Sequence, residues 1–306
     1  MLCLGIDTSN YTTSAALYDA VSGEIIQSRK LLTVKEGELG LRQSDAVFQH
    51  TLNLPETVNA VLPKGGKKIE RIAVSVSPRD EEGSYMPCFM AGKGTAQILA
   101  GAYGAELKYF SHQAGHIAAA LYSSDSLYLL EKEFIAFHVS GGTTEAVKVT
   151  PDKNRIFTVE PVSRSLDLKA GQAIDRTGNL LGLPFPAGPE LDKLSLQSEK
   201  EFKIKPFMKG GNCSISGLQN KCEKMKENKE KDCDIAKYCI DYISQVIYEM
   251  TSSILLKYPG LPLVYSGGVM SNTLIRKRLS EEFGAVFAAP GFSSDNAAGL
   301  AVLASI

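Results

Sequence analysis

Tryptophan is absent from this chain, and only four of its 306 residues are histidines. The six cysteines form no C-x-x-C pair and no regular framework, so we expect reduced thiols, as in a cytoplasmic protein. No apolar run approaches the length of a membrane span. The first residues, M-L-C-L-G-I-D, lack a basic region and reach Asp7 too early for a signal peptide. We therefore predict a cytoplasmic protein without a membrane segment.

An excess of charge is also missing. The chain has 33 basic and 34 acidic residues, which gives a formal net charge of −1. Such a balance creates no field that would capture nucleic acid unaided. If RNA is a substrate, a local basic patch or a partner protein must hold it. The length, with 44% hydrophobic residues, is sufficient for two domains with full cores.

One pattern occurs twice in the chain. Residues 135–150, shifted back by 131 positions, fall on residues 4–19, and both copies run from one apolar segment through a small polar turn into another. Hydroxyl positions also match: Ser140 on Ser9, Thr143 on Thr12 and Thr144 on Thr13. Each copy reads as a hairpin whose bare N–H groups and hydroxyls form an anion cradle of the kind that phosphates use. Two ordinary hairpins that match by chance are the alternative, and the shared hydroxyls favour duplication.

Two similar halves that each present such a hairpin resemble the superfamily of actin, sugar kinases and heat-shock chaperone ATPases. The resemblance implies a duplicated, two-lobed α/β fold with a ligand cleft between the lobes. We expect the first lobe at residues 1–125, joined by a C-terminal helix at 293–306, and the second lobe at 126–292.

Local patterns give further expectations for secondary structure. Residues 41–61 have helical spacing, and Pro55 should kink or split that helix. Residues 199–213 read as irregular structure. The last helix is expected from Ser293 to Ser305, with Asp295 in its first turn.

The stretch S-H-Q-A-G-H places His112 and His116 four residues apart, on one face of a helix. This spacing lets two imidazoles reach one metal ion, although a chance pair at a helix start is the alternative. A zinc peptidase would carry H-E-x-x-H, with the glutamate as general base. Gln113 stands at that position and cannot take up a proton, so peptidase chemistry is disfavoured.

Glycine-rich turns are the next candidates for a binding site. V-S-G-G-T-T at 139–144 belongs to the repeated hairpin, and S-G-G-V at 266–269 joins a strand to a helix. Glycine at such places allows the backbone to approach a ligand closely, although each stretch also reads as an ordinary tight turn. Similarly, Asp175 reads alone as a solvated carboxylate and P-A-G-P at 186–189 as a helix stop. The lysines of 221–231 alternate with glutamates and read as a solvated face.

Eight short motifs follow one another along nearly the whole chain: D-T-S (7–9), H-x-x-x-H (112–116), V-S-G-G-T (139–143), A-G-Q-A-I-D (170–175), L-L-G-L-P-F-P-A-G-P (180–189), C-S-I-S-G-L (213–218), G-G-V-M-S-N (267–272) and S-S-D-N-A-A (293–298). In this order they resemble the tRNA threonylcarbamoyladenosine transferase family, formerly described as O-sialoglycoprotein endopeptidases.

The resemblance implies one divalent transition metal, iron or zinc, held by His112, His116 and Asp295. It also implies ATP, AMP or an acyl-adenylate as ligand, tRNA held together with partner proteins, and a homo- or heterodimer with a related fold. The residues that would hold the nucleotide or acyl-adenylate are Asp7, Thr8, Ser9, His138, Val139, Ser140, Gly141, Gly142, Thr143, Asp175, Gly188, Gly267, Gly268 and Asn272.

The chain departs from the family pattern at two stretches expected near the active site. After D-T-S the family has Cys-Asp-Glu where this chain has N-Y-T at 10–12, and S-P-R-D-E-E at 77–82 replaces Gly-Pro-Gly-Leu. These departures suggest a divergent paralogue with a changed acceptor. A buried carboxylate in the replaced loop could restore the lost negative charge and act as a general base, and a solvated acidic loop is the alternative. The candidates are Asp80, Glu81 and Glu82, since the sequence identifies no other catalytic residue.

The first functional hypothesis is a metal-dependent, nucleotide-binding carbamoyl or threonylcarbamoyl transferase that acts on tRNA adenosine or on a small-molecule amine. The second is a non-catalytic, nucleotide-binding scaffold in a multiprotein complex. The third, a sugar-kinase-like phosphotransferase, needs an aspartate base near the second hairpin, where His138 and Ser140 stand instead. Retention of the metal-ligand positions favours the transferase.

Overall fold

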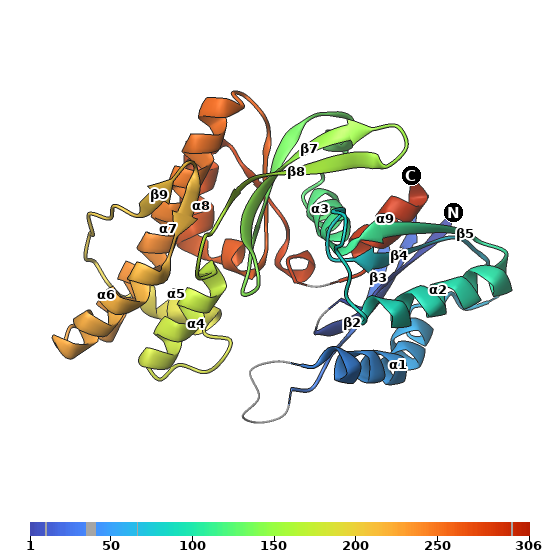
Figure 1. The fold of residues 1–306 in the computed structure, drawn as a ribbon, viewed down its shortest axis with the longest axis horizontal. Coiled ribbons are helices and arrows are strands. Elements are labelled where there is room, and N and C mark those ends of the chain that lie inside the picture. The colour runs from blue at the N-terminus through green and yellow to red at the C-terminus, as the bar shows by residue number, and fades with distance from the viewer. Residues whose placement is uncertain (10, 35–40, 66, 295) are drawn as a thin grey trace. The chain divides into compact units, whose positions relative to one another are not determined.

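The computed structural model describes residues 1–9, 11–34, 41–65, 67–294 and 296–306 and divides into two compact units. Unit 1 comprises Met1–Leu127 and Ser294–Ile306, and unit 2 comprises Tyr128–Ser293. Each unit is built on one five-stranded sheet (Figure 1).

The sheet of unit 1 has the strand order β3-β2-β1-β4-β5. Strand β1 pairs antiparallel with β2 and parallel with β4. The elements of this unit are β1 (Leu2–Asp7), β2 (Thr12–Asp19), β3 (Ile25–Leu31), α1 (Gln43–Asn59), β4 (Ile69–Ser77), α2 (Phe89–Tyr103), β5 (Glu106–Ser111), α3 (His112–Ser123) and α9 (Ala298–Ser305).

The sheet of unit 2 has the strand order β12-β11-β6-β7-β8. Strand β6 pairs antiparallel with β7 and parallel with β11. The elements are β6 (Phe134–Val139), β7 (Thr144–Asp152), β8 (Ile156–Arg164), α4 (Ala170–Leu180), α5 (Gly188–Ser195), β9 (Phe207–Lys209), β10 (Asn212–Ser214), α6 (Ser216–Glu227), α7 (Asp232–Lys257), β11 (Leu263–Ser266), the short helix η2 (Gly268–Ser271), α8 (Thr273–Phe283), β12 (Val286–Phe287) and the short helix η3 (Pro290–Phe292).

The repeat predicted from the sequence is a repeat of structure. We compare neighbouring strands in order, starting at β3 in one sheet and at β8 in the other. In both sheets the successive strand pairs are antiparallel, antiparallel, parallel and parallel. Asp7 lies opposite Ser14 in the first hairpin, and His138 lies opposite Glu145 in the second. These are the same two positions after the shift of 131 residues, so the hairpins share their register as well as their topology.

Alternation along β1 explains how helices cover both faces of the sheet in unit 1. Leu4 and Ile6 pack with Leu54 of α1 and Ala96 of α2. Gly5 points to the other face, where an added Cβ would lie 2.6 Å from Ala301 N of α9. Helices α1 and α2 therefore cover one face, and α9, which packs against α3, covers the other (Figure 1).

Helix α7 is the centre of the core in unit 2 (Figure 1). It is 26 residues long, and its buried apolar side chains recur at helical spacing. On the sheet, Tyr265 of β11 stacks between Phe137 of β6 and Phe287 of β12, with ring centroids 4.5 Å and 5.1 Å apart. Offset stacking of this kind adds to the burial of the three rings.

Two local expectations are wrong. Helix α1 continues through Pro55, so the expected split does not occur, because Leu54 and Val58 pack the helix onto the sheet on both sides of the proline. Residues 207–214 form the β9–β10 hairpin rather than irregular structure. Gly210 and Gly211 both have positive φ, at 57° and 82°, and a Gly-Gly pair of this type makes the tight turn of a two-residue hairpin.

The last helix begins at Ala298, five residues later than the expected Ser293. Ser293 instead follows η3, and the side chain of Asn296 accepts a hydrogen bond from Ala298 N at 3.0 Å, which favours a helix start after Asn296. Asp295, expected in the first turn, lies outside the described residues.

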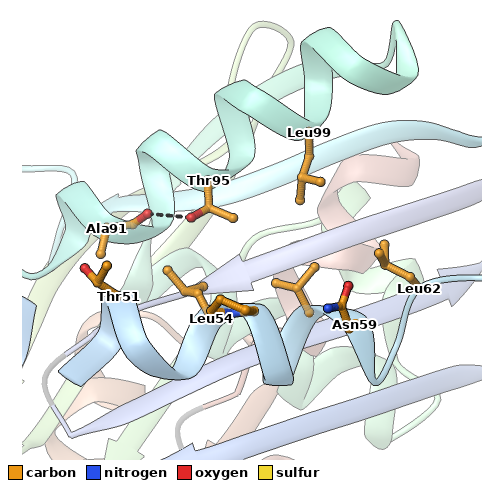
Figure 2. Close-up of a pocket in the computed structure, with 9 residues that line it drawn as sticks. Thr51, Leu54, Asn59, Leu62, Ala91, Thr95 and Leu99 are labelled. Carbon is orange, nitrogen blue, oxygen red and sulfur yellow. Dashed lines mark hydrogen bonds between the residues drawn. The ribbon is translucent and has the colours of Figure 1, made fainter. Parts of the chain in front are cut away.

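A groove of about 310 Å³ lies between α1 and α2 in unit 1. Thr95 Oγ1 donates to Ala91 O beside it at 3.0 Å. No residue that the sequence predicts to bind a ligand lines this groove. Its labelled lining residues are Thr51, Leu54, Asn59, Leu62, Ala91, Thr95 and Leu99 (Figure 2). Across the described part of the chain, no helix is long and apolar enough to cross a bilayer.

The close contact between α3 and α9 predicts opposite effects for two helical glycines. An added Cβ at Gly299 would lie 2.6 Å from Ala119 N, whereas one at Gly94 of α2 meets nothing within 4 Å. Gly299→Ala should therefore lower the free energy of unfolding by roughly 1–3 kcal/mol or more. Gly94→Ala should raise it by about 0.5–1 kcal/mol, because alanine favours the helix. Denaturant unfolding of both variants checks this, and equal effects would contradict the packing described.

Candidate functional site

The first two turns of α3 bring together two of the predicted metal ligands. The rings of His112 and His116 lie edge-on, with centroids 4.3 Å apart. Strand β5 leads directly into this helix, and the Ser111 side chain caps it by accepting from Ala114 N at 3.1 Å. The sequence prediction that both histidines share one helix face is confirmed.

Asp7, at the end of β1, is fully buried and binds the first turn of α3. Its carboxylate accepts hydrogen bonds from Ser9 Oγ at 2.6 Å and from Ser75 Oγ, and it pairs with His112 Nδ1 at 3.1 Å. Burial raises the pKa of Asp7, but the neighbouring charge of His112 and the three hydrogen bonds outweigh it, so the pKa lies below its usual range. A carboxylate at Nδ1 fixes the orientation and tautomer of an imidazole, as it does around many metal ions.

The third predicted metal ligand, Asp295, lies outside the described residues. Within the described ranges, no group of three or more histidine, cysteine, aspartate or glutamate side chains is arranged to hold a metal ion. The described part of the predicted metal site is therefore the pair of imidazoles. Imidazole nitrogens are common ligands of iron and zinc, so the chemistry of these two donors fits either metal.

The other residues of D-T-S organise the end of β1. Thr8 Oγ1 donates to Cys88 O at 3.0 Å and accepts from Gly92 N at 3.2 Å, so it ties β1 to the start of α2. Ser9 donates to Asp7. Both side chains are almost completely buried. Their hydroxyls therefore have partners within unit 1.

The acidic loop after β4 is exposed at all three candidate bases, Asp80, Glu81 and Glu82. Burial, on which the interpretation as a general base rested, is not present at these side chains. Asp80 nevertheless lies beside the histidines, because its Oδ2 accepts from Ser111 Oγ, the cap of α3, at 3.0 Å.

In unit 2, the turn between β6 and β7 lies against the start of α4. Ser140 N donates to Thr143 O at 2.7 Å, and Gly171 N of α4 donates to Ser140 O at 3.1 Å. A Cβ at Gly171 would lie 2.6 Å from Gly141 N, so only glycine permits this approach. The turn is thus held from behind by α4.

Several predicted binding glycines face open space. An added Cβ at Gly141, Gly142, Gly188 or Gly268 would meet nothing within 4 Å. Gly267 differs, because it has φ +98° and an added Cβ would lie 2.6 Å from Val139 C. The structure therefore brings the turn after β11 onto the end of β6, next to residues 140–143, and leaves room around both turns.

The polar residues predicted in unit 2 have different surroundings. His138 Nδ1 lies 3.2 Å from Ser266 Oγ. Asp175 Oδ1 accepts from Ala187 N at 2.9 Å, which links it to the start of α5, and burial raises the pKa of this carboxyl although that hydrogen bond opposes the shift. Asn272 caps α8 by accepting from Ile275 N at 3.0 Å and also donates to Asp192, so both ends of its amide are occupied.

Sequence reasoning missed His50, a fully buried side chain of α1. Its Nδ1 lies 2.8 Å from Thr13 Oγ1 in the first hairpin, and among the described residues its Nε2 has no hydrogen-bond partner. Burial lowers the pKa of His50, while the charge of Asp7 opposes this shift. The available signal was its position four residues from both Ala46 and Leu54, on the buried stripe of the helix.

Comparisons with known proteins agree with the whole-chain resemblance. The sequence matches the profile of the family described as tRNA N6-adenosine threonylcarbamoyltransferase over residues 20–302. A protein of that name from Chlorobium phaeobacteroides is 30% identical over 338 residues, which cover 100% of this chain and 92% of the relative.

Two solved structures are similar to this one in fold. Full-length HypF in its phosphate- and nucleotide-bound form has a TM-score of 0.61 at 13% identity, over 98% of this chain and 45% of that one. A ROK family glucokinase from Streptomyces griseus, in complex with glucose and AMPPNP, has a TM-score of 0.54 at 10% identity. The match covers 100% of this chain and 99% of the glucokinase. At these identities the likeness shows the fold alone, and it confirms the predicted α/β fold of two sugar-kinase-like lobes.

The loop that precedes α4 depends on Asp167. Its carboxylate accepts from Ser214 Oγ, from Ile215 N at 2.7 Å and from Ser216 N at 3.2 Å, at the start of α6. Burial raises the pKa of Asp167, but these hydrogen bonds outweigh it and hold the pKa far below its usual range. The carboxylate thus joins the loop that supports the 140–143 turn to α6.

Asp167 is exposed, and solvent screens its interactions, so Asp167→Asn should lower the free energy of unfolding at pH 7 by only about 0.5–1 kcal/mol, the lower part of the range for loss of a helix cap. Because the folded pKa is depressed, the stabilisation is present above the unfolded pKa of about 3.9 and is lost as the pH falls below it. Denaturant unfolding should therefore show that the free energy of unfolding of the variant differs less from that of the parent at pH 3 than at pH 7. Glu81→Gln is the control, because Glu81 is exposed like Asp167 but lies outside these hydrogen bonds. A pH-independent difference for Asp167→Asn would contradict the assignment.

Proposed function

The chain belongs to the tRNA N6-adenosine threonylcarbamoyltransferase family, and we propose that it transfers a threonylcarbamoyl group to N6 of an adenosine in tRNA. The observation that carries this proposal is the extent of the family match, which leaves only residues 1–19 and 303–306 unmatched. The departure at residues 10–12 falls in the unmatched part. The replaced loop at 77–82 falls within the matched part.

The proposed donor is threonylcarbamoyl-adenylate. The adenosine N6 amine attacks the carbonyl carbon, a C–N bond forms, and the bond from that carbon to the adenylate oxygen breaks. AMP leaves, and the amine loses one proton. The protein must therefore hold an adenylate phosphate, stabilise the charge that builds on the carbonyl oxygen, and accept or pass on one proton.

We assign phosphate binding to residues 139–143 of unit 2. Backbone N–H groups at a glycine turn form a concave site for anions. Ser140 N and Thr143 N already donate within this turn, to Thr143 O and Ser140 Oγ, so the N–H groups of Gly141 and Gly142 are those proposed to bind phosphate. The support is the repeated hairpin, the open space around Gly141 and Gly142, and the anchoring of the turn by Gly171 of α4. Gly188 and Gly268 also border open space and are the further candidates for close contact with the nucleotide.

We assign metal binding to His112 and His116 of unit 1, with Asp295 as the proposed third ligand. An iron or zinc ion bound there would act as a Lewis acid on the carbonyl group. Asp7 supports this assignment as a positioning residue, because its buried carboxylate holds Nδ1 of His112 and so directs the Nε2 side of the ring away from Asp7. Among the acidic loop residues, Asp80 alone is hydrogen-bonded to the cap of α3, which places it beside the histidine pair.

Metal content tests the first assignment. The purified protein should retain about one transition-metal ion per chain, and His112→Ala with His116→Ala should abolish this retention without unfolding the chain. Asp7→Asn should weaken metal affinity by roughly 10- to 100-fold, because the amide orients His112 less well. Elemental analysis and competition with a chelator measure both effects.

His138→Ala is the matched control, since it removes a histidine of unit 2 and should leave metal content unchanged. Undiminished metal in the double histidine variant would remove the assignment. Unchanged affinity in a folded Asp7→Asn variant would remove the positioning role of Asp7.

Nucleotide binding tests the second assignment. Gly141→Val should abolish calorimetrically detected binding of AMP, because its side chain would fill the space that a phosphate needs at the turn. The fold should survive, since a Cβ at Gly141 meets nothing within 4 Å. Gly101→Val, at an equally open glycine of α2, is the control. Equal affinity in Gly141→Val and the parent would mean that the repeated hairpin has a structural role only.

A further inference from the structure

A second pocket, of about 410 Å³, lies in unit 2, away from the turns at 139–143 and 266–269 in the chain. The segment 202–205 forms one side, and α6 together with the start of α7 forms the other. Three lysines, one carboxylate and two aromatic rings dominate its lining: Lys203, Lys205, Lys221, Glu230, Phe202 and Tyr238.

The charge of this pocket is strongly positive. Between residues 200 and 231 the chain has nine lysines and four glutamates, although its overall net charge is −1. The one carboxylate in the lining, Glu230, is already paired with Lys200 at 3.1 Å, and Lys200 also binds Asp234 at 2.9 Å.

The three lysines of the lining are exposed, and none of them forms an ion pair with a carboxylate in the described part of the chain. Like charges gathered around one concave surface repel one another unless an anion compensates them. An anionic ligand would therefore be attracted to this pocket more strongly than to an evenly charged surface.

The wall of the pocket is firmly packed. The Phe202 ring meets the Tyr238 ring edge-on at 5.2 Å, and the Lys221 ammonium lies 6.0 Å from the Tyr238 centroid. Met225 of α6 is buried in the core of the unit, and Pro206, next to Lys205, is also buried. The lysines thus extend from anchored backbone, which lowers the entropic cost of holding a ligand.

We propose that this pocket binds the phosphate backbone of RNA and holds tRNA on unit 2, an inference that rests on the transferase function proposed above. A chain with a net charge of −1 needs a local basic patch to bind RNA at all, and this pocket supplies one. Lysine ammoniums bind phosphate as point charges. The lining contains no arginine, asparagine or glutamine, the side chains that most often read base edges, so the contact positions RNA without selecting its sequence.

Salt-dependent RNA binding tests the proposal. Fluorescence anisotropy would measure the affinity of the protein for labelled, unmodified tRNA between 50 and 200 mM KCl, about the range over which phosphate contacts are salt-sensitive. The variant with Lys203→Ser, Lys205→Ser and Lys221→Ser should bind on the order of 10- to 100-fold more weakly at 0.1 M salt. The slope of log affinity against log salt should fall by about 2 to 3, roughly one unit for each lysine.

Two control variants make the result specific. Arginine at the same three positions should preserve the slope, because the charge is kept. Serine at Lys64, Lys67 and Lys68, three exposed lysines of unit 1, should leave affinity and slope unchanged within about twofold.

The proposal is overturned if the pocket variant keeps the parental affinity for tRNA and the parental salt slope. It is also overturned if the unit 1 variant loses as much tRNA affinity as the pocket variant, or if the parent does not bind tRNA at 50 mM salt. Because binding is measured without the acyl donor, the two proposals fail separately. Transfer without lysine-dependent binding would reject the pocket alone, and lysine-dependent binding without transfer would reject the reaction alone.

Discussion

At the end of the first strand of each unit, one polar side chain is hydrogen-bonded to a serine of the neighbouring parallel strand. In unit 1 it is Asp7 with Ser75, and in unit 2 it is His138 with Ser266. Asp7 and His138 are equivalent after the shift of 131 residues. Both sheets therefore have a hydrogen bond between the end of the first strand and a serine of the neighbouring strand, but the side chain at this position is a carboxylate in unit 1 and an imidazole in unit 2. In unit 1 the contact includes a fully buried carboxylate, and an unpaired buried charge would cost several kcal/mol.

This buried charge explains much of unit 1. Its partners come from β4, α3 and the turn after β1, so pairing with Asp7 fixes the ends of these elements at one point. The histidine pair is a consequence of this arrangement, because His112 is oriented by Asp7 and His116 lies on the next helical turn. Unit 2 has no carboxylate at the equivalent position, and its turn at 140–143 is held by backbone contacts to α4 instead. The two repeats thus differ in the groups at their hairpin ends, and we propose the one in unit 1 for a metal and the one in unit 2 for a phosphate.

The sequence predicts those features that depend on neighbouring residues. Both hairpins, the shared face of His112 and His116 and the glycine turn at 266–269 follow from local spacing. The β9–β10 hairpin was also encoded locally, by Gly210 and Gly211, but its strands are only three residues long and too short to show alternation. Features that depend on tertiary contacts could not be predicted. The hydrogen bond from Asn272 to Asp192, the orphaned Nε2 of buried His50 and the gathering of Lys203, Lys205 and Lys221 around one pocket each require elements that are distant in the chain.

The central proposal is that this chain modifies adenosine in tRNA. The most direct measurement incubates the purified protein with threonylcarbamoyl-adenylate and unmodified tRNA, digests the RNA to nucleosides and analyses them by mass spectrometry. The account predicts an adenosine that carries the threonylcarbamoyl group at N6, with one AMP released for each group transferred. If no such nucleoside forms, while the relative from Chlorobium phaeobacteroides forms it on the same tRNA, the account is contradicted.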